Sequence, residues 1–398
     1  MQRILFVDDE PKLLSGLRRM LHAMRGQWHM DFAGSGAEAL TRLLEQPFDI
    51  VVTDMRMPFM DGSELLRLIR ERFPSTIRMV LSGQCDRHAV LKAVGPAHQF
   101  LTKPCNSETL KESLNRASQL RDRLGAAWPR EVVSCVEAVP SLPDSLADLS
   151  TELAEPDSGN DQIGRIIGND PGMAVRVLQL VNSGFYGSPQ RTSDPPGAAS
   201  LLGAERLREL IDSSEAFVAT TPGQPHWIGV ADVVEHSRAV SEAAESIAAS
   251  ESDDPHLIAE ARWGGLLHDV GALVLLQQVP ERYAAVLMTR TGSQCICDRE
   301  QAEFDADHAA MGAYLLALWG LPDSVVRITA LHHAPAESDD CNFTALTAVH
   351  AADCLTGDPE DHRKCTLDFE YIERIGKSDR IAAWTELCRT LQPEGILA

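Results

Sequence analysis

The chain has 398 residues, of which 44% are hydrophobic and 24% charged, and its formal net charge is −22. These values are typical of a water-soluble protein with two domains, and they exclude a low-complexity chain. An acidic surface repels nucleic-acid phosphates, and the sequence has no basic stripe with interleaved aromatic residues, so direct DNA binding is disfavoured.

Two further sequence features indicate a cytoplasmic protein without a membrane anchor. No apolar run approaches the roughly 20 residues that span a bilayer, and the acidic opening segment MQRILFVDDE is unlike a signal peptide. The nine cysteines are an odd number, which favours reduced thiols. Cys295 and Cys297 form the one close pair. A single pair lacks the four soft ligands of a structural zinc site, so we interpret both as ordinary thiols, with metal binding as the alternative.

Residues 1 to about 120 alternate short apolar runs with amphipathic stretches. The runs cover residues 4–7, 30–33, 50–52, 79–81 and 99–101. Strands that alternate with helices predict an α/β, doubly wound, five-stranded parallel sheet covered on both faces. In such a sheet ligands bind beyond the carboxyl ends of the strands.

Residues with related chemistry follow four of these predicted strands: Asp8, Asp9, Asp54, Ser82 and Lys103. Converging carboxylates need a hard cation such as Mg²⁺, and a hydroxyl and an ammonium group suit the oxygens of a phosphoryl group on one carboxylate. Helix capping could explain Asp8 or Asp9 alone. It does not explain suitable residues after four separate strands.

The segments VDDE, VVTDMRMPFMDG, LSG and LTKP resemble the signature of CheY-like receiver domains of two-component response regulators, across residues 1–121. The resemblance implies that Asp54 accepts the phosphoryl group. Asp8, Asp9, Asp54 and the backbone carbonyl of Arg56 would hold Mg²⁺, and Ser82 and Lys103 would sense the phosphoryl group. Phe100 stands at the position of the family's switch aromatic, where plain core packing is the alternative. The Lys103–Pro104 bond is usually cis in the family, and the implied partner is a sensor histidine kinase or a phosphotransfer protein.

Residues 107–130 form a predicted connecting helix and linker. Apolar residues recur at helical spacing from Ser107 to Leu124, and Gly125 and Pro129 punctuate the pattern. From residue 131 onward we predict an all-α domain, apart from a short strand considered at Val132 and Val133.

The blocks LPDSL, NDPGMAVRVLQLVNSGFYG and GAASLLGAERLREL resemble the HDOD domain, a helical output module related to the HD phosphohydrolases. We assign it residues 131–340, with a helical extension over residues 341–398. Within that extension, Ile381, Ala382, Trp384 and Leu387 form an amphipathic stretch that we expect to pack on the helical domain.

The second half of this region contains seven residues of metal-ligand type in or beside helical patterns: His236, His268, Asp269, His308, His332, His333 and Asp353. Imidazoles and carboxylates from several helices of one bundle build dinuclear metal centres. Adjacent residues on a helix lie about 100° apart. The His332–His333 doublet therefore predicts either two neighbouring metals, or one ligand beside one outer residue.

The order of these seven residues also resembles the ligand order of HD-GYP phosphodiesterases. The resemblance implies a bridging role for Asp269, one or two transition metals such as Fe or Mn, and an additional acidic position at Asp232. Ala272 replaces the lysine of active members, and Ala334–Glu337 replaces their Glu and GYP loop. Two hypotheses stay open: a protein-interaction module for an unknown downstream partner or a second copy of the chain, and a receiver-controlled metal-dependent phosphohydrolase acting on cyclic nucleotides or nucleotides.

Overall fold

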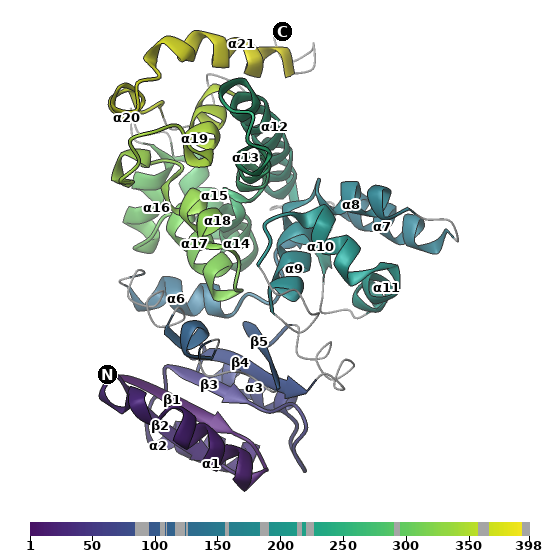
Figure 1. The fold of residues 1–398 in the computed structure, drawn as a ribbon, viewed down its shortest axis with the longest axis vertical. Coiled ribbons are helices and arrows are strands. Elements are labelled where there is room, and N and C mark those ends of the chain that lie inside the picture. Colours follow the sequence, from purple (N-terminus) through teal and green to yellow (C-terminus); the bar gives the residue numbers. More distant parts are fainter. Residues whose placement is uncertain are drawn as a thin grey trace.

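The computed structural model describes residues 1–83, 95–103, 108, 110–115, 124, 126–155, 159–183, 191–212, 217–219, 227–289, 295–356 and 366–391. An N-terminal α/β domain lies at the bottom of Figure 1, and a larger helical domain lies above it. The predicted fold class is confirmed for both regions. None of the helices in the described ranges is long and apolar enough to cross a membrane.

The N-terminal domain is built on a five-stranded parallel sheet with the strand order β2-β1-β3-β4-β5. The strands are β1 (Gln2–Val7), β2 (Trp28–Ala33), β3 (Ile50–Thr53), β4 (Ile77–Gly83) and β5 (Gln99–Lys103). All five predicted strands are present. The chain order reverses beside β1 and β3, so their carboxyl ends meet at one crevice, where α/β sheets bind ligands.

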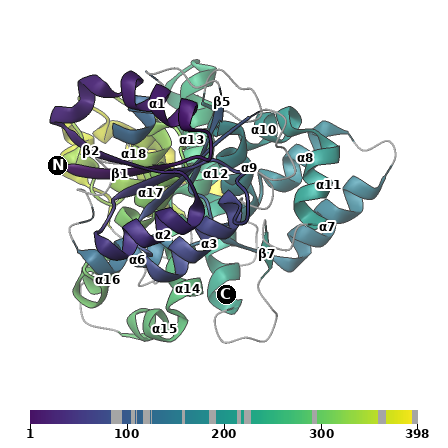
Figure 2. The same cartoon turned by 90° about the horizontal axis from the view of Figure 1, so that it is seen from below.

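Helices cover both faces of this sheet, with α1 (Pro11–Met20) on one side and α2 (Gly36–Glu45) and α3 (Gly62–Arg72) on the other (Figure 2). A 3₁₀ turn, η1, spans His22–Gly26. Burial on both faces explains why β3 reads as an unbroken apolar run rather than an alternating one. The Ser35 and Asp61 side chains cap α2 and α3 by accepting hydrogen bonds from the first-turn backbone.

The helical domain contains a series of short helices around one long helix, α12. Its described helices are α6 (Ala127–Ser134), α7 (Pro143–Ala154), α8 (Asn160–Ile167), α9 (Pro171–Asn182), α10 (Pro195–Leu202), α11 (Ala204–Asp212), α12 (Trp227–Glu251), α13 (Pro255–Leu267), α14 (Val270–Gln278), α15 (Pro280–Met288), α16 (Ile296–Phe304), α17 (His308–Leu318), α18 (Asp323–Leu331), α19 (Ala345–Leu355), α20 (Phe369–Arg374) and α21 (Ile381–Leu391). The 3₁₀ turns η2 (Pro335–Glu337) and η3 (Ser378–Arg380) and a two-stranded parallel sheet of β6 (Pro140–Ser141) and β7 (Val218–Ala219) complete it.

The C-terminal helix α21 packs on α12 and α19, as expected from its amphipathic pattern. Trp384 is fully buried, and its indole Nε1–H donates to Glu251 Oε1 at 3.0 Å. This contact ties the end of the described chain to the long helix of the bundle.

The strand considered at Val132 and Val133 is wrong, because both residues lie within helix α6. Val133 is fully buried, and this packing overrides the preference of β-branched residues for strands. Residues 108 and 110–115 lie in a helical segment, but most of the predicted connecting helix falls outside the described residues, as does Pro104.

The helical domain packs against the amino ends of β4 and β5, opposite to the carboxyl ends that form the crevice. Gln99 Nε2 donates to the carbonyl of Leu318 at 3.0 Å, and Gln179 Nε2 donates to the carbonyl of His98 at 3.3 Å. An ion pair joins Arg70 to Glu137. The two domains therefore share a polar interface as well as an apolar core.

Candidate functional site

The first candidate site lies at the carboxyl ends of the sheet strands. The ammonium group of Lys103 donates to Asp8 Oδ2 at 2.7 Å and also to Asp54 Oδ1, and the Arg56 backbone N–H donates to Asp54 Oδ2 at 2.8 Å. Asp8 and Asp54 are buried, whereas Asp9 is exposed. The fold thus brings three of the predicted residues into direct contact.

Burial and Lys103 act in opposite directions on Asp54. Burial raises the pKa of the Asp54 carboxyl and outweighs the lowering effect of the Lys103 ammonium group, so the pKa lies above its usual range. Burial lowers the pKa of Lys103, but its bonds to Asp54 and Asp8 prevail and raise it. The lysine therefore stays charged beside the two carboxylates.

Neighbouring residues of the same edge fit around this contact. Ser82 is buried near the end of β4, and Phe100 is buried within β5. Gly62 begins α3 against the backbone of Asp54, and an added Cβ would lie 2.2 Å from the Asp54 carbonyl oxygen. The glycine of the MDG segment is required there by close approach.

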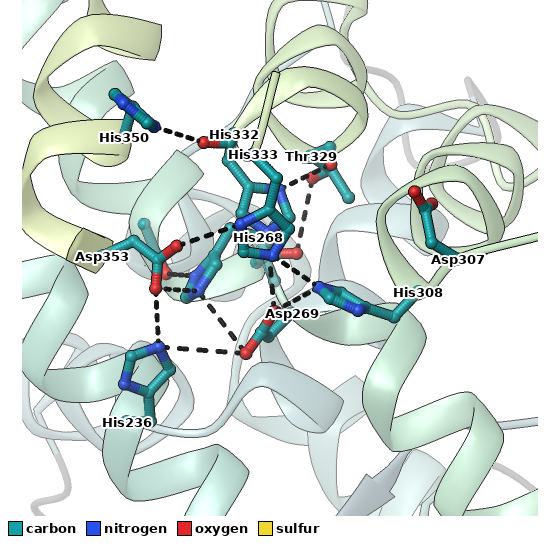
Figure 3. Close-up of polar contacts among 12 residues, drawn as sticks. His236, His268, Asp269, Asp307, His308, Thr329, His332, His333, His350 and Asp353 are labelled. Carbon is teal, nitrogen blue, oxygen red and sulfur yellow. Dashed lines mark hydrogen bonds and ion pairs between the residues drawn. The ribbon is translucent and has the colours of Figure 1, made fainter. Parts of the chain in front are cut away.

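The second candidate site is a cluster in the helical domain that brings together all seven predicted ligand-type residues (Figure 3). They come from five places in the bundle. His236 projects from α12, His268 and Asp269 lie at the junction of α13 and α14, and Asp353 projects from α19. His308 is the first residue of α17, and His332 and His333 directly follow α18.

The cluster divides into two groups that meet at Asp269. In the first group, His236 Nε2 lies 3.0 Å from Asp353 Oδ1, and His268 Nε2 lies 3.6 Å from Asp269 Oδ2. In the second, the other oxygen of Asp269, Oδ1, lies 3.2 Å from His308 Nε2 and 3.7 Å from His332 Nε2. Two ligands at about 2.1 Å from one metal lie roughly 3.0–3.4 Å apart, depending on their angle. Both groups have spacings close to this range.

Several nitrogen and oxygen atoms that could ligate a metal are buried in the cluster without a hydrogen-bond partner among the described residues. They are His268 Nε2, His332 Nε2, His333 Nδ1 and Asp353 Oδ2. An unsatisfied buried polar atom costs about 1–3 kcal/mol. Two of these four residues belong to each group, so their unpartnered atoms fit a metal-ligand role in both.

Backbone carbonyls orient two of these imidazoles. His268 Nδ1 contacts the carbonyl of Gly265 at 2.6 Å, and His332 Nδ1 contacts the carbonyl of Thr329 at 2.8 Å, each three residues earlier on its helix. Because a carbonyl only accepts, each Nδ1 carries the proton and each Nε2 presents a lone pair. The neutral tautomer that binds metals is thus selected by the helices themselves.

The electrostatics of the cluster favour ionised carboxylates and act in opposite directions on its histidines. Burial would lower the pKa of His308, but Glu300 and Asp269 outweigh it and hold that pKa well above its usual range. Burial lowers the pKa of His268 to about 4 and also lowers that of His333. Burial alone would raise the pKa of both aspartates, but neighbouring histidines, His268 beside Asp269 and His236 beside Asp353, hold them well below their usual range.

Gly271 explains how Asp269 comes so close to His308. An added Cβ on Gly271 would lie 1.9 Å from the His308 carbonyl oxygen and 2.7 Å from the backbone nitrogen of Gly312. Only glycine permits α14 to begin directly against the first turn of α17.

A cavity of about 80 Å³ opens beside the cluster. Its lining includes Asp232, Ala272, Leu276, Tyr283 and Ile296, and none of the described residues that line it is Lys or Arg. Asp232 therefore faces the same space as the ligand-type residues. Ala272 occupies the cavity wall where the resemblance expected a lysine.

The adjacent histidines His332 and His333 do not fall into separate groups of the cluster. His332 and His333 follow the end of α18, their ring centroids lie 3.9 Å apart, and both fall in the second group. His332 still has the helical dihedrals φ −60° and ψ −25°, so a difference in direction along the helix does not by itself assign the two rings to separate groups. His333 Nδ1 also lies 3.5 Å from Asp353 Oδ2, so it faces the first group as well.

The sequence interpretation missed two buried residues that touch the cluster. His350 Nδ1 contacts the carbonyl of His332 at 2.7 Å, and Glu300 contacts His308. His350 stands one helical turn before Asp353, a spacing that could have indicated it. Cys297 joins Glu300 and His308 in a third ligand-type group, and Cys295 does not.

Comparisons with known proteins match both regions of the chain. A family model described as "Response regulator receiver domain" matches residues 4–115, and one described as "HDOD domain" matches residues 139–335. The hydrogenase transcriptional regulatory protein HoxA of Cupriavidus necator is 32% identical over 124 residues, which are 31% of this chain and 25% of HoxA. Response regulator protein PilR of Pseudomonas aeruginosa is 28% identical over 204 residues, which are 48% of this chain and 45% of PilR. The chain thus spans less than half the length of these relatives.

Solved structures resemble the chain in part. The signal receiver domain of an HD domain-containing protein from Pseudomonas fluorescens is 30% identical, with a TM-score of 0.29, and covers 30% of this chain and 97% of its own. The MmoQ response regulator from Methylococcus capsulatus is 23% identical, with a TM-score of 0.47, and covers 62% of this chain and 98% of its own.

Proposed function

This chain is a two-component response regulator with a receiver domain followed by an HDOD domain, and we propose that phosphorylation of Asp54 controls a metal-bearing HDOD output module. The observation that carries the proposal is the contact of one ammonium group, that of Lys103, with both Asp8 and Asp54. The receiver domain implies a phosphodonor partner such as a sensor histidine kinase.

Phosphorylation can be tested without the cognate kinase. Incubation with acetyl phosphate and Mg²⁺ should add one phosphoryl group to the full chain by intact mass, and Asp54→Asn should abolish the gain. Asp61→Asn is the matched control, because Asp61 caps α3 seven residues away and Asn caps helices equally well. A gain of mass in Asp54→Asn would contradict the assignment.

We propose that the HDOD domain holds two transition metals such as Fe or Mn. His236, His268 and Asp353 would hold one, His308, His332 and His333 the other, and Asp269 would bridge them. The unpartnered nitrogens of His268 and His332 support this arrangement. A bound metal would act as a Lewis acid and lower the pKa of its coordinated water. His268→Ala should lower the metal content of the purified protein relative to the parent.

The output domain fits a binding module for a downstream protein better than a phosphohydrolase. The described lining of the cavity lacks Lys and Arg, so beyond the proposed metals an anionic cyclic dinucleotide would find no cationic side chain there. The two oxygens of Asp269, which face histidines of different groups, favour the phosphohydrolase as second candidate. Turnover of cyclic di-GMP with added Mn²⁺ or Fe²⁺ decides between them, since fast turnover would contradict the binding module.

The domain interface supports a route by which the two sites communicate. Strand β5 carries Lys103 at one end and Gln99 at the other, and Gln99 binds the last residue of α17. Helix α17 begins with His308 of the cluster. A shift of β5 on phosphorylation would therefore act on α17 as a rigid element. Hydrogen exchange in residues 99–103 and 308–318, with and without beryllofluoride, tests this route, and identical exchange would contradict it.

A further inference from the structure

Glu300 is a buried carboxylate with no assigned role. It lies on α16 with no exposed surface, and its two oxygens receive three hydrogen bonds. Tyr283 Oη–H donates to Oε1 at 2.7 Å. The His308 backbone N–H donates to Oε2 at 2.8 Å, and His308 Nδ1 lies 2.6 Å from the same oxygen. Every donor that reaches this carboxylate thus belongs to the cluster residue His308 or to the cavity wall.

The contact with Nδ1 fixes what the other nitrogen of His308 can do. A carboxylate accepts hydrogen bonds, so Nδ1 carries a proton and Nε2 is the atom that faces the cluster. His308 Nε2 lies 3.2 Å from Asp269 Oδ1 and 3.0 Å from His333 Nε2. The backbone bond fixes the position of the same residue, so both the ring and its helix are held.

His308 needs such a partner because of its position in the fold. His268 and His332 each follow a helix, where the carbonyl three residues earlier accepts the Nδ1 proton. His308 is the first residue of α17, so its own helix offers no preceding carbonyl. Glu300, from the neighbouring helix, takes the place that a backbone carbonyl takes for the other two histidines.

We propose that Glu300 is the positioning residue that orients His308 and strengthens it as a metal ligand, an inference that rests on the proposed two-metal centre. A carboxylate acceptor makes the imidazole more basic than a carbonyl does, and losing such an outer partner lowers metal affinity about 10- to 100-fold. Tyr283 orients Glu300 in turn, and it links this outer shell to the cavity.

The test measures metal affinity of the full-length protein by chelator competition with Mn²⁺, and the visible spectrum with Co²⁺. Glu300→Gln keeps the side-chain volume and should weaken Mn²⁺ binding 10- to 100-fold and alter the Co²⁺ spectrum, while the unfolding midpoint of the metal-free protein stays near that of the parent. Glu303→Gln is the matched control on the same helix, because Glu303 is exposed and pairs with Arg282 at the surface. It should change neither readout.

Other results of these measurements would contradict the proposed role of Glu300. Unchanged affinity in Glu300→Gln overturns the positioning role and leaves the metal centre intact. A parent protein that binds no metal overturns both. If Cys297→Ala weakens binding as much as Glu300→Gln, Glu300 is itself a ligand in the Cys297 group instead. Should Glu300→Gln fail to fold, Tyr283→Phe removes one donor to the same carboxylate and should weaken binding less than 10-fold; unchanged affinity there also overturns the inference.

Discussion

The two candidate sites solve the problem of buried carboxylates in different ways. In the receiver domain, Asp8 and Asp54 have a cation of the chain itself, Lys103, within hydrogen-bond distance. In the HDOD domain, Asp269 and Asp353 lie among histidines instead. Burial disfavours charge on His268 and His333, whereas Glu300 and Asp269 favour it on His308. The first site balances its charge with a lysine, whereas we propose that metal ions complete the charge balance of the second.

This difference predicts how each site should respond to the loss of a bound ion. Under the proposed function, a site with an internal cation would keep its geometry as Mg²⁺ and a phosphoryl group bind and leave, which suits a switch. Under the proposed metal centre, the site with unpartnered buried ligand atoms would be destabilised without its metal, because metal-binding free energy would then contribute to folding free energy. The predictions below begin with the largest expected effect.

Removal of transition metals should separate the two domains. A chelator such as phenanthroline, used with Mg²⁺ present, should destabilise the HDOD domain by about 3–4 kcal/mol if the metal is 100- to 1,000-fold above its dissociation constant. Hydrogen exchange should rise in α17 and α19 and stay unchanged in β1 and β3. An equal rise in both domains, or no rise in either, would remove the distinction between the sites.

The sequence predicted the receiver site more completely than the HDOD site, for a physical reason. Parallel strands bring their carboxyl ends to one edge, so residues after separate strands, such as Asp54 and Lys103, must converge. In a helical bundle the spacing gives candidates but not their grouping. His332 and His333 share a group, which their spacing in the sequence does not reveal.

Other features depend on tertiary contacts that the sequence does not encode locally. Glu300 and Glu303 lie three residues apart in one acidic segment, and only the fold makes the first buried and the second exposed. The short strand expected at Val132 and Val133 failed for a similar reason, because packing of α6 decided the local structure.

The interface between the domains contains a buried cation, Arg78. Backbone carbonyls surround its guanidinium group. Its guanidinium donates to the carbonyls of Pro96 at 2.6 Å, Thr76 at 3.2 Å and Ser134 at 2.5 Å, and burial lowers its pKa to about 9. Arg78→Met should cost about 3 kcal/mol of unfolding free energy, because the carbonyls lose their donors. Arg72→Met, at an exposed position, is the control. Equal denaturation midpoints for the two variants would contradict the importance of this contact.

The same interface should weaken at acidic pH through His98. Burial, reinforced by the nearby Arg78 charge, holds the pKa of His98 well below 6.5. Its Nδ1 accepts the Arg78 backbone N–H at 3.0 Å, so Nε2–H faces the Ser134 carbonyl. Because the folded pKa is depressed, this stability is present above pH 6.5 and is lost as pH falls below it.

Between pH 7.5 and pH 5.5 the loss from His98 should be about 1.4 kcal/mol. Denaturation at both pH values, in the parent and in His98→Gln, measures it, since Gln does not titrate. The variant should lose less stability on acidification than the parent by that amount. Equal losses would show that His98 does not sense pH in the folded chain.

The smallest expected change in stability comes from the loop after Asp54, which contains a strained turn. Phe59 has a φ of +69°, and the Met60 backbone N–H donates to the Pro58 carbonyl at 2.9 Å, which makes a tight three-residue turn around Phe59. Such a turn with positive φ is strained for a residue that has a Cβ. The Phe59 ring is fully exposed, so it provides no packing in compensation.

Phe59→Gly should therefore raise the unfolding free energy by roughly 0.5–1 kcal/mol, since relief of about 1–2 kcal/mol exceeds the added freedom of glycine in the unfolded chain. Phe59→Ala is the matched control, because alanine removes the ring and keeps the Cβ that causes the strain. Denaturation of both variants distinguishes backbone from side chain. If alanine stabilises as much as glycine, the effect comes from the exposed ring. If neither does, the turn next to Asp54 stores no strain.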